Sequence, residues 1–391
     1  MKRYLLLLAV IVPCLAACRP KQEKADFGYI VQVFTGGWHN RNYSTEQIIG
    51  RLDTVSNRIP VQKVIIGWNL DAEPYRQIGE FLHSKGIQMI LWLPVFSETG
   101  EIAECSPALD LWGKAPVSYA LQEGENFTFY CPGAESNVHS FLEIYEKHFS
   151  DCGFDGVFID KIRSQSFVGG VSGILSCGCE LCEARFRELG VDLGEIKALY
   201  EEEGDGFFNV SAYSPVEGFT FENSRAADFF NAKAQIISES VGEICDFFHE
   251  KGMIVGMDLY APLMAQFVGQ DYKALSEKAD FIKPMLYRKT EAPAGIGFEY
   301  NLMLKSIPGA KGYPEILTDA EFLNGQLEYI SRASCNKYPG IEINYREDIA
   351  RTEPEYIRES VGAVKAAGFS GAVLSWDVML APDSHIDCLS F

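Results

Sequence analysis

Short apolar runs alternate with amphipathic stretches along most of the chain. The amphipathic stretches carry apolar residues at helical spacing; the stretch 44–55 opens with Ser44 as a helix cap, and the stretch 73–86 stops at Gly86. Strands that are separated by helices predict a parallel sheet. The apolar runs cover residues 29–34, 63–68, 88–95, 155–160, 253–260, 280–287, 340–345 and 370–377. Eight such units predict an α/β fold, a closed (β/α)8 TIM barrel in one domain over residues 27–391, with a doubly wound open sheet as the alternative.

The first residues of the chain have the pattern of a secretion signal. A basic start precedes an apolar core of about a dozen residues, and two alanines precede Cys18. This core is too short for a stable membrane span. The segment LAAC resembles the bacterial lipobox, in which cleavage leaves the cysteine as a lipid-carrying N-terminus. We therefore expect a signal peptide over residues 1–17, lipidation of Cys18 and a polar tether over residues 18–26. The alternative is an ordinary cleaved signal with a chance cysteine.

Composition limits the partners that this chain can bind. A hydrophobic fraction of 47% suits a large core, and a formal net charge of −20 disfavours nucleic acid and anionic lipid, which would be repelled. A neutral substrate is not disfavoured. The chain contains neither the G-x-x-x-x-G-K-S/T phosphate loop nor the G-x-S-x-G elbow, so a P-loop NTPase or a serine hydrolase has no sequence support, and no organic cofactor is expected.

Polar and aromatic residues gather where the predicted strands end. Active sites of (β/α)8 barrels lie at this C-terminal face. Aromatic faces stack on the C–H surfaces of sugars and carboxylates perform acid/base chemistry, so the set predicts a carbohydrate cleft. Its members are Trp38, His39, Trp68, Asn69, Asp160, Lys161, Arg163, Asp258, Tyr260, Lys283, Tyr287, Arg288, Glu342, Asn344, Arg346, Trp376 and Asp377.

The fourth predicted strand, FDGVFIDKIR, is the most informative. Side-chain alternation makes Asp160 the carboxylate that this strand presents to the barrel mouth. The segment is similar to the chitinase strand pattern DGxDxDxE, but Ile162 stands where chitinases have their acid. It more closely resembles a group of glycoside-hydrolase-like TIM-barrel lipoproteins whose fourth strand reads DG-x-x-x-D-x-I-R. This resemblance implies that Asp160 and Arg163 take the places of that group's Asp and Arg, and its PMLY motif recurs here at Tyr287.

Three cysteines, Cys177, Cys179 and Cys182, lie within the segment SCGCELCEARFR, and Cys131 precedes a proline upstream. The segment resembles the zinc-cluster segment of thermophile-type β-galactosidases. The resemblance implies a structural Zn²⁺ held by these four thiolates, a closed tetrahedral site without a position for water. Those galactosidases carry an Asn-Glu pair where Asp160 and its neighbour stand here, so galactose specificity is not implied.

Other uses of the cysteine thiols remain open. Exported proteins usually form disulfides. The remaining partners for such bonds are Cys105, Cys152, Cys245, Cys335 and Cys388. An iron–sulfur cluster is less favoured, because its usual cysteine spacing is wider.

These residues together predict an exported glycoside hydrolase with a two-carboxylate mechanism. Asp160 is the expected nucleophile or acid, with Glu342 or Asp258 as its complement and Asp377 as a third candidate. Retaining enzymes hold the two carboxyl groups about 5 to 5.5 Å apart and inverting enzymes about 6.5 to 9.5 Å apart. Arg163 and Lys161 are expected to keep Asp160 ionised. The expected substrate-binding residues are Trp38, Trp68, Arg163, Tyr287, Trp376 and Asp377.

The predicted partners are a carbohydrate and, through the lipid anchor, the membrane of the bacterial cell envelope, at the periplasmic face or the cell surface. Nucleic acid is not an expected partner. Two other functions fit the same residues. One is a non-catalytic carbohydrate-binding lipoprotein on a barrel scaffold, and the other is a different barrel enzyme, such as a deacetylase, a lyase or a metal hydrolase.

Overall fold

The computed structural model describes residues 27–97, 105–116 and 128–390. The predicted signal peptide, the tether and Cys18 lie outside these residues.

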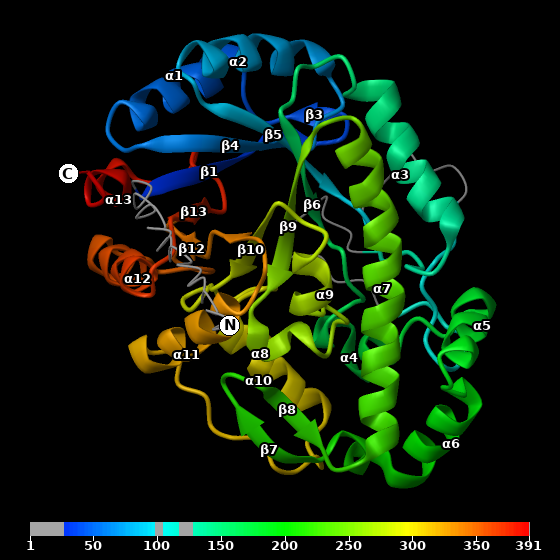
Figure 1. Cartoon of the computed structure of the whole chain (residues 1–391). Helices are drawn as coiled ribbons and strands as arrows, with labels where there is room; N and C mark the ends of the chain where they lie inside the picture. The colour runs from blue at the N-terminus through cyan, green and yellow to red at the C-terminus, as the bar shows by residue number, and fades with distance from the viewer. Residues whose placement is uncertain (1–26, 98–104, 117–127, 391) are drawn as a thin grey trace, which may run out of the picture.

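Eight parallel strands close into a barrel (Figure 1). Each strand pairs with the next along the barrel, and the last pairs with the first through Gly28 and Gly371. The closure confirms the predicted TIM barrel and rules out the open sheet. Each strand falls on one predicted apolar run. The strands are β1 (Gly28–Phe34), β4 (Val61–Gly67), β5 (Gln88–Pro94), β6 (Gly156–Asp160), β9 (Ile254–Tyr260), β10 (Phe281–Met285), β12 (Gly340–Glu342) and β13 (Gly371–Ser375).

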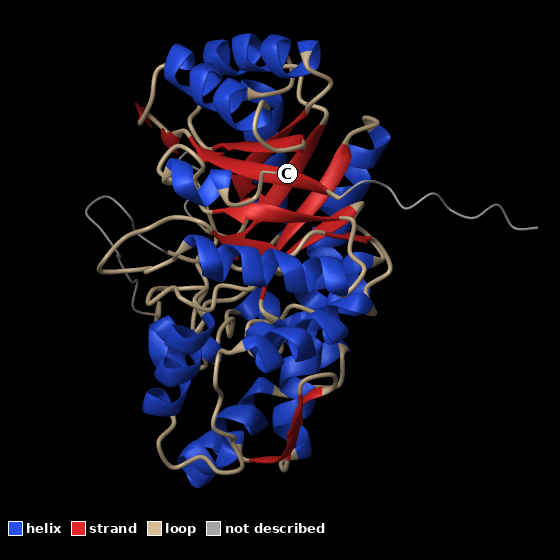
Figure 2. Ribbon diagram, turned by 90° about the vertical axis from the view of Figure 1, so that its left-hand side faces the viewer, coloured by secondary structure: helices blue, strands red, loops and turns tan. Residues whose placement is uncertain are grey.

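Helices surround the barrel (Figure 2). Five short strands accompany the eight barrel strands in the described residues. The helices are α1 (Thr45–Ser56), α2 (Ala72–Ser84), α3 (Glu135–His148), α4 (Gly170–Ile174), α5 (Glu180–Glu188), α6 (Leu193–Glu203), α7 (Ser224–Glu250), α8 (Pro262–Ala265), α9 (Tyr272–Ser276), α10 (Ile296–Ser306), α11 (Ala320–Ser331), α12 (Pro354–Ala366) and α13 (Asp383–Asp387), with 3-10 turns at Phe167–Gly169 and Gly204–Phe208. The short strands are β2 (Gly36–Gly37), β3 (Asn40–Arg41), β7 (Val210–Ser214), β8 (Gly218–Phe221) and β11 (Asn336–Lys337).

Local sequence explains where the first two helices begin and end. At the start of α1, the Gln47 amide donates to Ser44 Oγ at 3.3 Å and the Ser44 amide donates to Gln47 Oε1 at 2.8 Å, a reciprocal capping box. The chain leaves α2 through Gly86 at φ +71, a backbone conformation that glycine adopts without steric cost. Both boundaries match the sequence prediction.

The barrel interior forms a core that is separate from the layer between strands and helices. Phe158 and Phe281 stack inside it with ring centroids 6.0 Å apart. A Cβ on Gly256 would lie 2.1 Å from the Phe281 ring, so glycine is required for this ring to cross the barrel. The buried interior residues are Ile30, Ile65, Ile90, Phe158, Phe281, Tyr338 and Val373. The barrel interior is therefore filled by side chains.

The chain between β6 and β9 forms a large insertion, which occupies the lower right of Figure 1. It contributes α4 to α7 and the β7–β8 hairpin, and Figure 1 shows α5, α6 and the hairpin beside the lower half of the long helix α7. A phenylalanine-rich core holds the insertion together, with Phe221 and Phe230 stacked at 5.1 Å. The fourth strand is therefore followed by a structured insertion rather than by a single helix.

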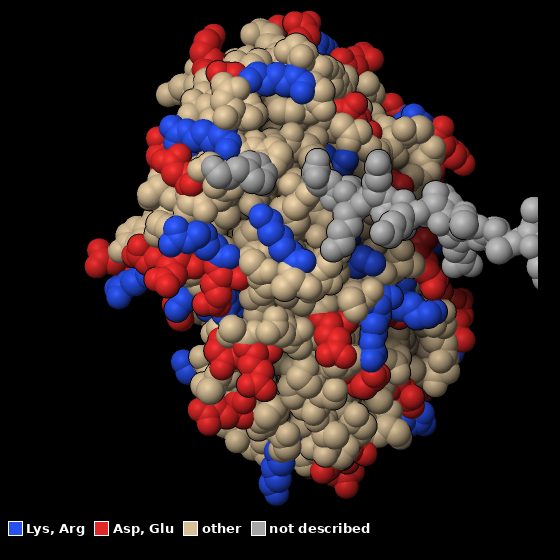
Figure 3. All heavy atoms as spheres, turned by 60° about the vertical axis from the view of Figure 1, so that its left-hand side comes forward, with Lys and Arg blue, Asp and Glu red and all other residues tan. Residues whose placement is uncertain are grey.

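The charged side chains of one face of the molecule can be followed in Figure 3. On the face that Figure 3 shows, acidic and basic side chains are interspersed, and the described residues there form no continuous basic surface. None of the helices in the described parts of the chain is both long and apolar enough to cross a membrane.

Candidate active site and metal centre

Asp160 and Asp258 lie side by side at the mouth of the barrel. Strands β6 and β9 are parallel neighbours, and Ile159 pairs with Met257, so the next interior positions, Asp160 and Asp258, lie at the same level. Neighbouring strands are about 4.8 Å apart. The charge of Asp160 also raises the pKa of Asp258, as expected for two close carboxyl groups. The structure thus gives Asp160 a carboxyl neighbour.

Asp160 is half-buried and held by two N–H donors. The Trp92 indole donates to its Oδ2 at 3.1 Å, and the Lys161 amide donates to its Oδ1 at 2.5 Å. Lys161 has φ +52, a left-handed conformation that non-glycine residues adopt at a cost and that is common at functional sites. Its ammonium group lies 4.8 Å from the Trp68 ring. The strained backbone thus follows directly after the carboxylate.

Aromatic rings form a wall beside Asp160. The rings of Trp68 and Trp92 meet edge to face at 5.5 Å, and Phe34 lies 5.2 Å from Trp68. The Trp68 Nε1 atom is buried and has no hydrogen-bond partner among the described residues. Sequence reasoning placed Trp68 here but missed Trp92, although alternation along β5 puts Trp92 on the interior face.

Asp258 forms a buried ion pair with Lys283. Lys283 Nζ lies 2.9 Å from Asp258 Oδ2 and donates to the Tyr287 hydroxyl at 2.6 Å. Burial raises the pKa of Asp258 to about 7, although Lys283 and Arg163 act in the opposite sense. Burial would lower the pKa of Lys283, but Asp258 and Tyr287 raise it above its ordinary value. Asp258 Oδ1 has no hydrogen-bond partner among the described residues.

Glu342 is not the neighbour of Asp160. It lies on β12, and both β9 and β10 separate that strand from β6. The Lys289 amide donates to Glu342 Oε1 at 2.6 Å, and burial raises the pKa of Glu342 to about 7. Of the two predicted complements, the structure places Asp258 beside Asp160.

Asp377 forms hydrogen bonds that connect the loop after β13 to the loop that contains Tyr43. It accepts hydrogen bonds from the Tyr43 hydroxyl at 3.2 Å and from the Met379 amide at 3.0 Å. Burial raises the pKa of Asp377 to about 6. The half-buried Trp376 is fixed through its amide, which donates to Asn344 Oδ1 at 2.6 Å. This rim lies across the mouth from Asp160.

Trp38 is half-buried in the loop that follows β1. Its carbonyl oxygen accepts hydrogen bonds from the Leu70 amide at 2.9 Å and from Asn69 Nδ2 at 3.2 Å. These contacts tie the first rim loop to the second. The predicted rim residues Trp38 and Trp376 therefore belong to adjacent strands, because β1 pairs with β13.

Glu299 is a buried carboxyl group that sequence reasoning missed. It lies on α10 and accepts hydrogen bonds from the Tyr260 hydroxyl at 2.8 Å, from Ser166 Oγ at 3.2 Å and from the Ala294 amide at 3.1 Å. Its Oε2 has no partner among the described residues, and burial raises the pKa of Glu299. Its sequence signal is weak: a single glutamate in the largely apolar segment IGFEYNLML.

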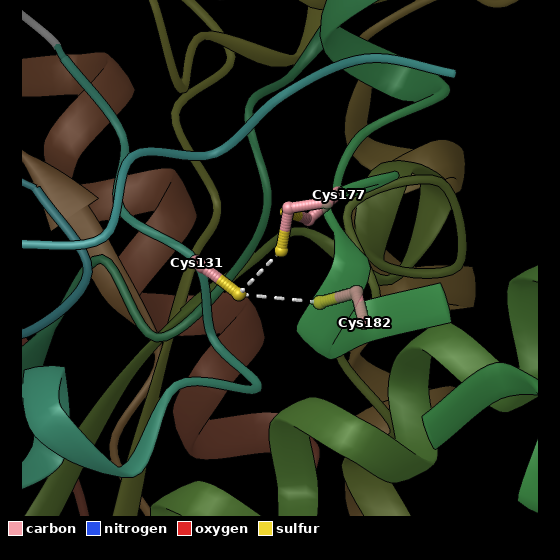
Figure 4. A group of neighbouring side chains, drawn as sticks. Cys131, Cys177 and Cys182 are labelled. Carbon is pink, nitrogen blue, oxygen red and sulfur yellow. Dashed lines mark hydrogen bonds between the residues drawn. The ribbon is translucent and has the colours of Figure 1, made fainter. Parts of the chain in front are cut away.

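The four predicted cysteines come together in one cluster. The sulfur atoms of Cys131, Cys177, Cys179 and Cys182 all lie within 4.8 Å of one another. Figure 4 shows the side chains of Cys131, Cys177 and Cys182 pointing toward one another from the loop after β5 and the run into α5. Cys179 caps α5 and Cys182 lies in its first turn.

The geometry of this cluster fits a metal ion better than disulfides. Cys131 Sγ lies 3.4 Å from Cys179 Sγ and 3.3 Å from Cys182 Sγ, beyond a disulfide bond length and close to the separation of sulfurs that share one Zn²⁺. The nine cysteines of the described residues are all free thiols. A Cβ on Gly133 would lie 3.1 Å from Cys182 Sγ, so the chain approaches the sulfurs closely there. The four thiolates would form a closed site of the structural kind.

Comparisons with known proteins agree on the fold. No family model and no curated protein matches the sequence. The structure is similar to the PgaB (BpsB) glycoside hydrolase domain of Bordetella bronchiseptica, with 14% identity, a TM-score of 0.60 and coverage of 93% of this chain and 99% of that one. It is also similar to α-L-fucosidase isoenzyme 2 of Paenibacillus thiaminolyticus, with 11% identity, a TM-score of 0.51 and coverage of 93% and 48%. The chain thus has the (β/α)8 fold of these glycoside hydrolase structures and spans about half of the fucosidase chain.

Proposed function

We propose that this protein is an exported hydrolase of glycans that works by a retaining, two-carboxylate mechanism. The observation that carries the proposal is the pair of Asp160 and Asp258, level with each other on neighbouring strands at the barrel mouth. The similarity to a glycoside hydrolase domain and to a fucosidase supports a carbohydrate as the substrate.

The surroundings of the two carboxyl groups suggest different roles. Asp160 is the more exposed of the two, so we assign it the attack on the anomeric carbon as the nucleophile. Asp258 has a pKa raised to about 7, which suits a group that must give and take a proton near neutral pH. The Lys283 ammonium 2.9 Å away stabilises the Asp258 carboxylate once its proton has left.

The proposed reaction has two steps and consumes one water molecule. Asp160 attacks the anomeric carbon while Asp258 donates its proton to the glycosidic oxygen, whose bond to that carbon breaks. A water then attacks the same carbon, Asp258 accepts the water's proton, and the bond to Asp160 breaks. Adjacent strands about 4.8 Å apart favour the close carboxyl spacing of retaining enzymes over the wider inverting one.

Aromatic side chains are proposed to bind the sugar rings. Trp68 and Trp92 form the wall beside Asp160, and Trp38 and Trp376 lie on the rim loops across the mouth. Tyr287 is bonded to Lys283, so its proposed contribution is to hold that ammonium group. The net charge of −20 is compatible with a neutral glycan.

A glycan screen that measures binding and cleavage together tests this function. We expect release of sugar from at least one glycan, and proton NMR of the first product should show retention of the anomeric configuration. Inversion would contradict the close pair. Binding without cleavage would favour the non-catalytic carbohydrate-binding protein, and a wild-type protein that neither binds nor cleaves glycans would exclude both functions.

We also propose that Cys131, Cys177, Cys179 and Cys182 hold a structural Zn²⁺. A bound zinc ion would cross-link the long fourth βα loop to the loop after β5 and would do no chemistry on the substrate. Elemental analysis should find about one zinc per chain, and Cys182→Ser should abolish it. The matched control is Cys245→Ser, because Cys245 is buried on α7 outside the cluster. Metal-free protein with fewer titratable thiols after denaturation would indicate disulfides instead.

The proposed location is the bacterial cell envelope, with Cys18 as the lipid-carrying residue. Support comes from the LAAC segment alone. Mass spectrometry of the mature protein should find an acylated N-terminal cysteine, and Cys18→Ala should release the protein from the membrane fraction. A mature protein from the native host that begins beyond Cys18, or that carries Cys18 without a lipid, would contradict the anchor.

A further inference from the structure

The guanidinium group of Arg163 lies over two aromatic rings. Its guanidinium carbon lies 4.9 Å from the centroid of the Phe129 ring and 4.4 Å from that of Tyr260. One terminal nitrogen donates to the Ser164 carbonyl at 2.9 Å, and the residue is buried. A planar guanidinium that stacks on two rings has one orientation, which lysine could not reproduce.

The clamped cation serves two buried carboxyl groups from different elements. Arg163 opposes the effect of burial on the pKa of Asp258 on β9 and on that of Glu299 on α10. Tyr260 joins the two sides, because its ring stacks on Arg163 while its hydroxyl donates to Glu299 Oε1 at 2.8 Å. Each carboxyl group keeps one oxygen without a partner among the described residues. Lys283 already pairs with Asp258 at 2.9 Å, so Arg163 adds to that positive charge at Asp258 and supplies positive charge at Glu299, where an uncompensated buried charge would be expensive.

The second ring of the clamp comes from the chain that leads into the cysteine cluster. Phe129 lies two residues before Cys131. The Phe129 carbonyl accepts from the Ala108 amide at 3.0 Å, and the Cys131 amide donates to the Ser106 carbonyl at 2.8 Å. Backbone hydrogen bonds on both sides of the ring therefore fix its position over Arg163.

We infer that Arg163 is a positioning residue of the proposed active site: held over the rings of Phe129 and Tyr260, it supplies positive charge that Asp258, beside Lys283, and Glu299 share. This inference rests on the proposed function for its catalytic meaning, and its electrostatic part stands without it. The charged and titratable groups that interact with Asp258 or Glu299 are Lys283, Asp160, Arg163, Tyr260, Tyr272 and Tyr287.

The test compares Arg163→Gln, which removes the charge, with Arg163→Lys, which keeps the charge and loses the stacking. Urea unfolding is followed between pH 5 and pH 8. Without the cation, the pKa values of the two carboxyl groups rise further, so the folded state holds protons to higher pH and loses stability as the pH increases. The urea midpoint of Arg163→Gln should therefore lie below that of Arg163→Lys, and the gap should be wider at pH 8 than at pH 5. A rise of about one unit in the pKa of one carboxyl group corresponds to a gap that is roughly 0.3 M wider at pH 8.

Two further variants keep the test decisive. Arg225→Gln, at an exposed arginine that pairs with Glu195, controls for loss of a cation and should follow the wild-type curve. If Arg163→Gln does not fold, the double variant with Glu299→Gln should restore folding, because it removes one uncompensated charge. The inference would be overturned if the urea midpoints of Arg163→Gln and Arg163→Lys changed with pH in parallel. It would also be overturned if the double variant failed to fold.

An activity measurement separates this inference from the proposed function. If a glycan is cleaved, the alkaline limb of kcat/KM should move to higher pH in Arg163→Gln and stay near wild type in Arg163→Lys, because Asp258 must be protonated to act as the acid. A limb that moves equally in both variants would contradict the charge role. Diverging unfolding curves without cleavage of any glycan would keep the electrostatic role and reject hydrolysis.

Discussion

The two ends of strand β6 each carry an aspartate, and the two are treated differently by the fold. Asp155, before the strand, accepts hydrogen bonds from His83 Nε2 at 2.9 Å and from the Met89 amide at 2.7 Å. Asp160, at the other end, faces the mouth with a second carboxyl group, Asp258, at its side. Both aspartates accept two hydrogen bonds, so what distinguishes Asp160 is its place at the barrel mouth and the second carboxyl group beside it.

The N-terminal arrangement recurs one quarter of the way around the barrel. Asp280, before β10, accepts from His249 Nε2 at 3.1 Å and from the Val255 amide at 2.8 Å. As at Asp155, the histidine ends a helix, and the amide belongs to the second residue of the following strand. This recurrence is typical of a feature that stabilises the barrel.

At the mouth, by contrast, buried polar atoms lack partners. Within the described residues these include Asp258 Oδ1, Glu299 Oε2 and Trp68 Nε1. Other such atoms of the described residues lie away from the mouth, among them Ser238 Oγ on α7 and Gln326 Nε2 on α11, so a missing partner does not by itself mark a site. This difference agrees with the usual division of (β/α)8 barrels, in which the N-terminal rim serves stability and active sites lie at the C-terminal rim.

The largest predicted effect separates the two aspartates of β6. Asp160→Asn should lower kcat/KM on a cleaved glycan by about 10²- to 10⁴-fold and leave folding intact, because it removes a group that acts in the reaction. Asp155→Asn should leave kcat/KM within about twofold and lower the free energy of unfolding by about 1 kcal/mol. Steady-state kinetics and urea unfolding check both variants. A comparable loss of kcat/KM in Asp155→Asn and Asp160→Asn would contradict the difference between the two rims.

The next effect concerns the buried ion pair at the mouth. Lys283→Met should lower the free energy of unfolding by about 3 to 5 kcal/mol, because it leaves Asp258 buried without its cation. The double variant with Asp258→Asn should recover part of that loss. An exposed pair is the control: Arg225→Met should cost at most about 1 kcal/mol. Equal free energies of unfolding for Lys283→Met and Arg225→Met would contradict the burial of the Lys283–Asp258 ion pair.

A smaller effect is the pH dependence that the mouth imposes. The pKa of Asp258 in the folded protein, about 7, lies above that of an unfolded aspartate, so the folded state binds the proton more tightly. Its contribution to stability is therefore present below about pH 4 and is lost as the pH rises toward 7. Asp258→Asn should flatten the decline of unfolding free energy between pH 5 and pH 8 by roughly 1 kcal/mol or more. A variant curve parallel to wild type would contradict the raised pKa.

The smallest effect belongs to the histidines of the N-terminal rim. His83→Gln should lower the free energy of unfolding by less than about 1 kcal/mol, because the pair is partly exposed. His249→Gln should behave alike, since it occupies the equivalent place. Neither should change kcat/KM. A large kinetic effect from either histidine would mean that the N-terminal rim takes part in function.

Much of this architecture could be predicted from local patterns. Each barrel strand is a short apolar run, and the helix boundaries at Ser44 and Gly86 are set by residues next to them. The cysteine grouping was also visible, because Cys177, Cys179 and Cys182 are close in the chain. Asp160 could be placed at the mouth because alternation along one strand decides which way a side chain points.

The partners of these residues depend on contacts between distant segments. Asp258 rather than Glu342 lies beside Asp160 because β6 pairs with β9, and neither strand's own pattern encodes that register. Glu299 enters from a helix with little sequence signal, and Arg163 meets Phe129 through the packing of separate loops. Local periodicity fixes elements and faces, whereas the relative placement of elements is set by their joint packing, and charge balance at the mouth follows from that placement.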